Sequence, residues 1–153
     1  MNSTAVALGS NLGDREAHLE FAVAELHAIL TGLRVSSWRQ TAPLGVSPQT
    51  DFLNGVVAGQ TSLGARELLD RLLAIEQARG RRRPYDGAPR TLDLDLILYG
   101  REVIDEPGLR VPHPRFRERR FVLEPLAEVA SDWVDPVTGL TIRELLAGLT
   151  SPG

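Results

Sequence analysis

The sequence predicts an α+β fold built on an antiparallel sheet. This prediction rests on two kinds of apolar periodicity within its 153 residues. Several short segments alternate in polarity with a period of two, as half-buried strands do. Two longer segments repeat their apolar residues every three or four positions, as amphipathic helices do. These segments follow one another in the order strand, helix, strand, strand, helix, strand.

The first half of this pattern is a strand, a helix and a second strand. Residues 4–8 predict the first strand, and residues 9–13 predict the turn after it. Asp14 can cap a helix that reaches about Leu30, and residues 34–41 alternate as the second strand. The buried stripe of this helix is predicted to be Leu19, Val23, Leu26 and Leu30.

The third strand follows residues 42–50, whose prolines and glycine exclude regular structure and predict a mobile loop. Residues 52–60 then alternate, which places Phe52 and Asn54 on one face close to that loop. A flat heterocycle could stack on Phe52 and hydrogen-bond to Asn54. A core phenylalanine beside a strand-end asparagine explains the same local sequence equally well.

The second helix is predicted to begin at Thr61 or Ser62 and to bury Leu68, Leu69, Leu72 and Ile75. Glu76 continues that apolar stripe, and a carboxylate in such a place requires a partner. The nearest cations are the arginines of residues 79–83, where the helix ends. Residues 84–89 form a second predicted mobile loop and lead into the last strand of the pattern.

That last strand, residues 89–99, carries two acids on one side. Asp93 and Asp95 are separated by about 6.6 Å along the backbone, while Leu92, Leu94, Leu96 and Leu98 are predicted to point the other way. Ile97 continues the acidic side as an apolar residue, so the acids are expected to be partly covered, which is costly without cations. A metal site is therefore favoured over a solvated polar face. Mg²⁺ suits it, because one or two carboxylates and substrate phosphates usually hold this ion.

Helical segments follow the sheet. Prolines on both sides hold His113 in an extended backbone. Further helices are predicted from Phe121 to Ala130 and from Ile142 to Leu149. The whole order predicts a ferredoxin-like βαββαβ arrangement, an antiparallel sheet with helices on one face and extra C-terminal helices, in one domain of residues 1–153.

The composition narrows the possible functions. With 42% hydrophobic and 24% charged residues, and no apolar run long enough to span a membrane, we expect a cytoplasmic protein without membrane contacts. The absence of cysteine excludes disulfides and thiolate metal sites. All 17 basic residues are arginines, which excludes a P-loop lysine and a Schiff-base lysine.

Positive charge is concentrated around the acidic strand. Residues 79–120 contain 11 arginines and 7 acids, a net charge of +4, whereas the remainder of the chain has a net charge of −7. Such local asymmetry predicts an anionic ligand bound at one place. A general nucleic-acid binder usually carries a wider basic surface, so nucleic acid is not an expected partner.

Three motifs along the chain resemble one family. The run from Pro89 to Asp95, preceded by residues 80–83 and followed by Val111–Pro114, resembles 6-hydroxymethyl-7,8-dihydropterin pyrophosphokinase of the folate pathway. The similarity extends from residues 9–13 to Phe121. It implies that the terminal diphosphate of ATP moves to the hydroxymethyl oxygen of the pterin and that AMP is released. ATP and the pterin are then the expected partners of a monomer, with a dimer as the alternative.

The resemblance also assigns residues. Two Mg²⁺ would be held by Asp93 and Asp95, and the catalytic residues would be Asp93, Asp95, Arg81 and Arg90. ATP would be bound by Glu76, Arg81, Arg83, Arg90, Leu96, His113 and Arg119. The pterin would be bound by Thr41, Ala42, Pro43, Leu44, Phe52, Asn54 and Phe121.

One departure and two alternatives accompany this assignment. The resemblance implies that residues 42–50 and 81–90 are two lids over the site. The family often carries Arg-Trp in the second lid, where this chain has Asp86-Gly87-Ala88-Pro89, so closure of this lid would use Tyr85 or Arg82 instead. A two-metal nucleotidyl transferase that attacks the α-phosphorus is a second enzyme hypothesis. An RNA-binding module on the same fold is a third, although only 5% of the residues are aromatic.

Overall fold

The structure is a computed structural model that describes residues 1–41, 51–79 and 91–149. Its elements are β1 (Asn2–Ser10), α1 (Arg15–Leu26), β2 (Thr31–Val35), β3 (Arg39–Thr41), β4 (Phe52–Thr61), α2 (Ala65–Ala78), β5 (Asp93–Tyr99), β6 (Ile104–Glu106), β7 (Leu109–Val111), a short 3₁₀ turn (Phe116–Glu118), α3 (Arg120–Ala130) and α4 (Ile142–Ala147).

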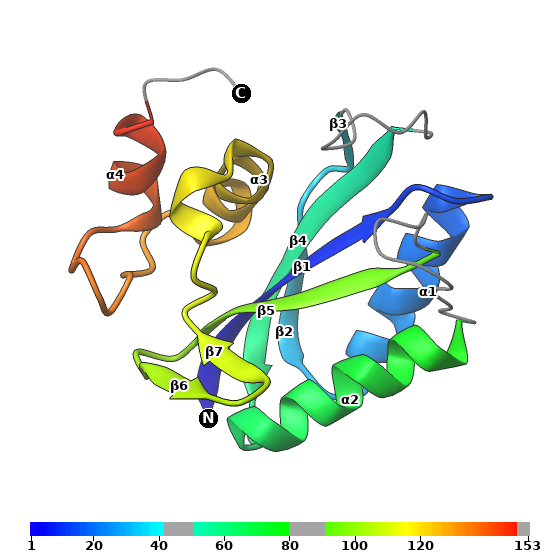
Figure 1. Cartoon of the computed structure of the whole chain (residues 1–153), viewed down its shortest axis with the longest axis horizontal. Helices are drawn as coiled ribbons and strands as arrows, with labels where there is room; N and C mark the ends of the chain where they lie inside the picture. Colours follow the sequence, from blue (N-terminus) through cyan, green and yellow to red (C-terminus); the bar gives the residue numbers. More distant parts are fainter. Residues whose placement is uncertain (42–50, 80–90, 150–153) are drawn as a thin grey trace.

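The main sheet has the strand order β2-β4-β1-β5, with β3 also paired to β4, and every pairing is antiparallel (Figure 1). The predicted antiparallel sheet is thus confirmed. The expected single strand over residues 34–41 is instead divided into β2 and β3. The backbone N–H of Ser36 still donates to the carbonyl of Val56. The ring of Trp38, however, lies against Gly55, where a side chain would collide with it. The chain therefore bends between the two short strands.

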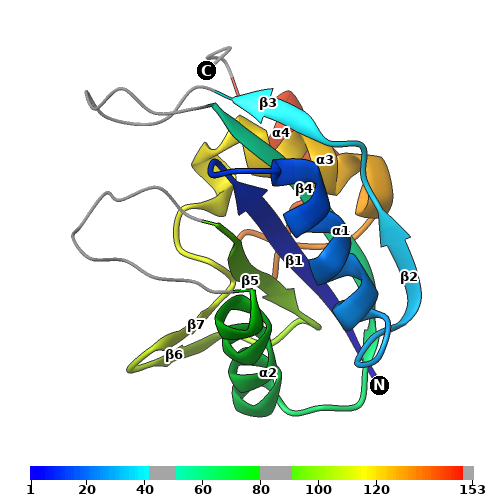
Figure 2. The same cartoon turned by 90° about the vertical axis from the view of Figure 1, so that its right-hand side faces the viewer.

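Helices cover both faces of the sheet (Figures 1 and 2). We call the side packed by α1 and α2 the α1 face and the side packed by α3 and α4 the α3 face. The core on the α1 face contains Val6, Leu19, Leu72 and Leu94 among its buried residues. The core on the α3 face contains Ala5, Val56, Ile97, Phe116 and Leu126 among its buried residues.

The two long helices are shorter than expected. Asp14 caps α1 as predicted, since its Oδ1 accepts a hydrogen bond from the backbone N–H of Ala17 at 3.1 Å. The helix ends at Leu26, although Leu30 is still buried. The second helix begins after Gly64, because Thr61 belongs to β4 and its hydroxyl accepts a hydrogen bond from the backbone of Leu63 in a local turn.

Strand β5 contains an irregularity that the alternation of its sequence conceals. Ala5 pairs with Leu98, but the next residue, Val6, pairs with Leu96, so β5 has one extra residue between these pairs. Leu94 and Leu96 pack on the α1 face, while Ile97 and Leu98 both pack on the α3 face. The expected common side for Leu98 and the other leucines is therefore wrong.

The remaining segments complete the edge of the sheet next to β5. Strands β6 and β7 form a separate hairpin, and the peptide bond between Val111 and Pro112 is cis.

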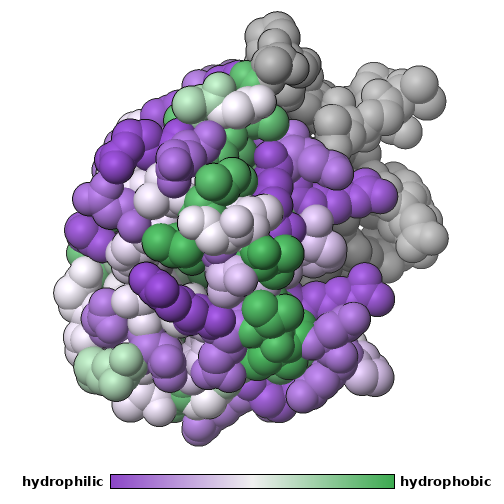
Figure 3. Space-filling view, turned by 90° about the vertical axis from the view of Figure 1, so that its left-hand side faces the viewer, coloured by the Kyte–Doolittle hydropathy of each residue, from purple (hydrophilic) through white to green (hydrophobic). Residues whose placement is uncertain are grey.

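Seen from the side of α4, the surface is mostly hydrophilic and its hydrophobic side chains lie in several groups separated by polar ones (Figure 3). Among the described residues, no helix has the length and apolar character needed to cross a membrane.

Candidate functional site

The two acids lie on the edge strand β5 and face the α3 side of the sheet. Asp93 and Asp95 are half-buried and alternate with the buried Leu94 and Leu96. Their partners on β1 are Gly9 and Ala7 respectively, two of the smallest residues. The prediction that both acids share one side of the strand is confirmed.

Glu76 fixes the backbone between these acids. It is 1% exposed on α2, and its Oε2 accepts a hydrogen bond from the backbone N–H of Leu94 at 2.6 Å. The expectation that this carboxylate lies on the buried stripe and needs a partner is thus confirmed. Of the arginines expected as partners, Arg79 donates through Nε to His18 Nδ1 at 2.8 Å and lies over the Phe21 ring. The other arginines of that cluster, at positions 81–83, lie outside the described residues.

His113 reaches the same region from the segment after β7. Its backbone N–H donates to the carbonyl of Ile97 at 2.9 Å, and its Nδ1 accepts from the backbone N–H of Arg115 at 3.2 Å. Burial and the positive charges of Arg119 and Arg115 lower the pKa of His113, against the opposing effect of Asp93. The ring is therefore neutral near pH 7, with its proton on Nε2.

A cleft of about 390 Å³ opens beside β5. This volume lies in the range of small-ligand sites. Its lining combines three predicted residues, Asp95, Leu96 and His113, with six that the sequence reasoning did not select: Leu69, Leu94, Gly108, Leu109, Arg110 and Pro114. Most of these six belong to the β6–β7 hairpin or the segment after it, whose position against β5 has no signal in the periodicity of the chain.

A second group of predicted residues meets at the other side of β1. Thr41 pairs with Phe52, and Asn54 Nδ2 donates to Thr41 Oγ1 at 2.5 Å. A side chain on Gly9 would lie 3.1 Å from Asn54 Oδ1 and 3.7 Å from the Phe52 ring, so both residues crowd this glycine. The sequence prediction that Phe52 and Asn54 share a face is confirmed.

Gly9 connects the two groups. It pairs with Asn54 on one side and with Asp93 on the other, which places the three residues in one row across β4, β1 and β5. Neighbouring strands lie about 4.8 Å apart, so the outer two backbones are separated by roughly 10 Å. This spacing suits two substrates whose reacting ends meet above the glycine.

Helix α3 contributes the last group. Phe121 lies in its first turn and packs against the core of the α3 face. The guanidinium carbon of Arg119, the residue before the helix, is 5.6 Å from the centre of the Phe121 ring. Six predicted site residues lie outside the described residues: Ala42, Pro43, Leu44, Arg81, Arg83 and Arg90.

The acid pair fits Mg²⁺ better than a metal held by protein alone. Within residues 1–41, 51–79 and 91–149, no group of three or more histidine or acidic side chains could enclose an ion. Two carboxylates on one side of a strand are nevertheless enough protein ligands for Mg²⁺, because this ion completes its coordination with water and phosphate oxygens.

Fold and site together define a mixed α/β protein with an acidic edge strand beside a cleft of small-ligand size. The sequence model described as 7,8-dihydro-6-hydroxymethylpterin-pyrophosphokinase matches residues 5–131. A Synechocystis 2-amino-4-hydroxy-6-hydroxymethyldihydropteridine pyrophosphokinase is 49% identical over 92% of this chain and 73% of its own length. The Bacillus subtilis protein of the same name is 51% identical over 84% of this chain and 79% of its own.

The chain therefore belongs to the 7,8-dihydro-6-hydroxymethylpterin-pyrophosphokinase family. The predicted resemblance is confirmed, and with it the enzyme class, an ATP-dependent pyrophosphoryl transferase of folate biosynthesis. This class favours diphosphate transfer over the nucleotidyl-transferase and RNA-binding alternatives.

Solved structures support the fold. A Plasmodium falciparum HPPK-DHPS crystal structure aligns with a TM-score of 0.75 at 15% identity and covers 95% of this chain. The wild-type protein aligns with a TM-score of 0.74. The present chain spans less than half of those longer chains, 43% and 44%.

Proposed function

We propose that this chain transfers the terminal diphosphate of ATP to 6-hydroxymethyl-7,8-dihydropterin on the α3 face, above Gly9. The observation that carries the proposal is the row formed by Asn54, Gly9 and Asp93. This row supports the proposal because an amide side chain that could bind a heterocycle lies one strand away from a glycine and two strands away from an acid that could bind metal-bound phosphate. Substrates bound at the two ends would meet over the residue with no side chain.

The pterin end uses Phe52, Asn54, Thr41 and Phe121. Because Asn54 Nδ2 is engaged by Thr41, its Oδ1 faces Gly9 and can accept a hydrogen bond from a pterin N–H. Phe52 and Phe121 would stack on the two sides of the flat ring. Ala42, Pro43 and Leu44 remain predicted contacts to the edge of the same ring.

The nucleotide end uses the cleft beside β5. Its apolar lining from Leu69, Leu96 and Leu109 suits an adenine base. The Nε2–H of the neutral His113 can donate to a phosphate oxygen, and Arg119 adds a fixed positive charge. Glu76 supports this end through the Leu94 backbone.

Asp93 and Asp95 would hold two Mg²⁺ against the triphosphate. Bound there, the ions would neutralise phosphate charge and align the attacking and leaving oxygens. Arg81, Arg83 and Arg90 remain the predicted additional cations for the transferring group.

The reaction is one displacement at the β-phosphorus of ATP. The hydroxymethyl oxygen of the pterin forms a bond to that phosphorus, and the bond to the oxygen bridging the α- and β-phosphates breaks. AMP leaves with the electron pair, and the hydroxyl proton passes to a nearby base, for which Asp95 is the candidate. The contribution of the protein is mainly alignment and electrostatic stabilisation.

Nucleotide product analysis tests this proposal. The protein is incubated with ATP, Mg²⁺ and the pterin alcohol, and the nucleotides are separated by chromatography. AMP formed in equal amount to a diphosphorylated pterin is the expected result, with no turnover in excess chelator. Release of free pyrophosphate would indicate nucleotidyl transfer instead, and the absence of turnover would overturn the proposal.

We further propose that the sheet is the ferredoxin-like βαββαβ arrangement, with β2 and β3 as the two halves of its second strand. Its strand order and antiparallel pairing support this. A single domain, a monomeric state and a cytoplasmic location remain predictions. Limited proteolysis tests the single domain, sedimentation equilibrium tests the monomeric state, and cell fractionation tests the location.

A further inference from the structure

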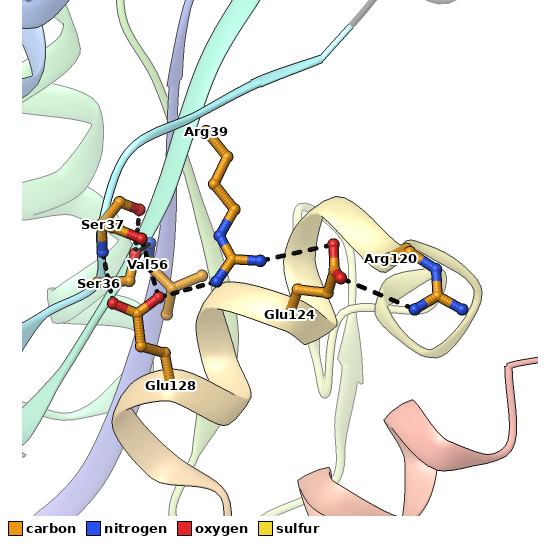
Figure 4. A network of polar contacts seen from close by, with 7 residues as sticks. All are labelled: Ser36, Ser37, Arg39, Val56, Arg120, Glu124 and Glu128. Atoms are coloured by element: carbon orange, nitrogen blue, oxygen red, sulfur yellow. Dashed lines mark hydrogen bonds and ion pairs between the residues drawn. The ribbon is translucent and has the colours of Figure 1, made fainter. Parts of the chain in front are cut away.

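A chain of alternating charges joins β3 to α3 on the face that carries the proposed pterin site (Figure 4). Arg39 Nη2 lies 3.0 Å from Glu128 Oε2, and Arg39 Nη1 lies 3.5 Å from Glu124 Oε1. Arg120 Nη1 continues the chain, 3.8 Å from the other oxygen of Glu124. One arginine of the sheet is thus held by two successive turns of the helix.

Arg39 stands directly beside the pterin-binding residues. It pairs with Asn54 in the β3–β4 ladder and precedes Thr41 by two positions, so it shares their side of the sheet. Its side chain runs from β3 toward Glu124 and Glu128 on α3 (Figure 4). It therefore spans the space between the Thr41–Asn54 hydrogen bond and the helix that begins with Arg120 and Phe121.

The first turn of α3, which carries Phe121, lacks one of its helical hydrogen bonds. Pro125 lacks an N–H, so the carbonyl of Phe121 cannot receive the usual helical hydrogen bond from that residue. Among the described residues, no side chain caps the start of this helix. Glu124 and Glu128 are also four residues apart, an unfavourable spacing for like charges unless a cation lies between them.

Glu128 anchors the far end of the same contact. Its two carboxylate oxygens accept from the backbone N–H of Ser37 at 2.8 Å and from the Ser37 hydroxyl at 3.0 Å. These hydrogen bonds and Arg39 lower the pKa of Glu128, which keeps it ionised near neutral pH. An arginine suits the place between the two acids because its planar fork presents several donors at once, whereas a lysine presents one compact charge.

We propose that Arg39 is a positioning residue for pterin binding, which holds Phe121 at the correct separation from Phe52 and Asn54. It does not contact the pterin; it sets the width of the gap into which the ring stacks. This inference rests on the proposed pterin site and adds to it a residue outside the predicted set.

The test replaces Arg39 with methionine, which keeps much of the length of the side chain and removes its charge. We expect the KM for the pterin to rise about three- to tenfold, since small misplacements of positioning groups are costly. The kcat and the KM for ATP should stay within about twofold. Arg39→Lys should give an intermediate KM for the pterin.

Arg143→Met is the matched control. This variant removes another exposed arginine–carboxylate contact, the one between Arg143 and Asp132 at 2.7 Å. That contact lies just after the C-terminal end of α3, away from Phe121. Both variants should keep the far-UV circular dichroism and thermal midpoint of the parent, because ion pairs as exposed as these contribute little to stability. Arg143→Met should leave all kinetic constants unchanged.

A double-mutant cycle with Phe121→Ala decides the mechanism. If Arg39 acts through Phe121, Arg39→Met should raise the KM for the pterin by less than about twofold in the Phe121→Ala background. A full, independent increase there would overturn the inference, as would an equal rise in the KM for ATP or an unchanged KM for the pterin in Arg39→Met alone. If Phe121→Ala by itself leaves the KM for the pterin unchanged, the proposed pterin site fails, and the inference fails with it.

Discussion

Glu76 Oε2 lies 2.6 Å from the backbone nitrogen of Leu94, the residue between Asp93 and Asp95. The buried carboxylate of Glu76, on α2, therefore holds the backbone of β5 from the α1 face, while the two acids project from the α3 face. The hydrogen bond lies in a place with little water, where the low local dielectric makes it stronger than it would be in solvent. The position of the acid pair thus depends on a residue that lies on the other side of the sheet.

Glu76→Ala should lower both stability and activity. The change leaves the Leu94 N–H without its acceptor, at a cost of about 1–3 kcal/mol in the free energy of unfolding. Glu76→Gln keeps an acceptor oxygen and should cost less. Urea denaturation followed by circular dichroism measures the stability of both variants, and initial rates of AMP formation measure their activity. An Ala variant as stable as the parent would contradict this role.

Asp93→Asn and Asp95→Asn should each reduce kcat/KM by about a thousandfold or more, because each removes a proposed metal ligand worth several kcal/mol in the transition state. The fold should survive, since two neighbouring negative charges become one. Initial rates of AMP formation at saturating Mg²⁺ measure the loss. Asp132→Asn, on the exposed Arg143 contact, is the control. Near-full activity in either β5 variant would refute the metal assignment.

Gly9→Ala should weaken pterin binding more than ATP binding. The new methyl group would lie 3.1 Å from Asn54 Oδ1, and the hydrogen bond from Asn54 to Thr41 limits how far that amide can retreat. We expect the KM for the pterin to rise about tenfold, since the reading group is displaced by a few tenths of an ångström. Gly64→Ala, where nothing lies within 4 Å of the added carbon, is the matched control. Equal losses for both substrates would argue against the placement of the pterin beside Gly9.

Stability should fall as the pH is lowered below about 6.5, the ordinary pKa of histidine. Burial lowers the folded-state pKa of His113 and of His18, so in this window the unfolded chain binds protons that the folded chain does not. The stability contributed by these neutral rings is present above pH 6.5 and is lost as the pH falls toward their folded-state pKa values. The midpoint of urea unfolding, measured at several pH values, reports the slope.

His113→Asn and His18→Asn should each flatten this pH dependence, and the double variant should remove most of it. The carboxylates with lowered pKa values, such as Asp135 and Glu128, titrate at lower pH and leave this window undisturbed. A slope that is unchanged in the double variant would show that other groups cause it.

Which residues of the candidate site share a face could be predicted, because short-range alternation decides it. Asp93 and Asp95 share a face simply because a strand has a period of two, and Glu76 is buried because it continues a helical stripe. The common side of Phe52 and Asn54 has the same origin. These features need no knowledge of what packs against them.

Other features depend on neighbours that the local sequence does not reveal. The bend between β2 and β3 arises where Trp38 lies on Gly55 of the adjacent strand, and the cleft beside β5 exists because the β6–β7 hairpin folds against that edge. Arg39 was not selected for the same reason. Its role depends on two acids about ninety residues further along the chain.

The additional residue in β5, opposite the step from Ala5 to Val6, has a consequence for how this strand can vary. It turns Tyr99 toward the α1 face, where its hydroxyl donates to the carbonyl of Leu63, while the acids upstream remain on the α3 face. Replacing a side chain here would leave unchanged which residues of β5 face α1 and which face α3. Deleting one residue would turn the side chains along half of the strand to the opposite face of the sheet. The number of residues in this segment is therefore constrained as tightly as their identity.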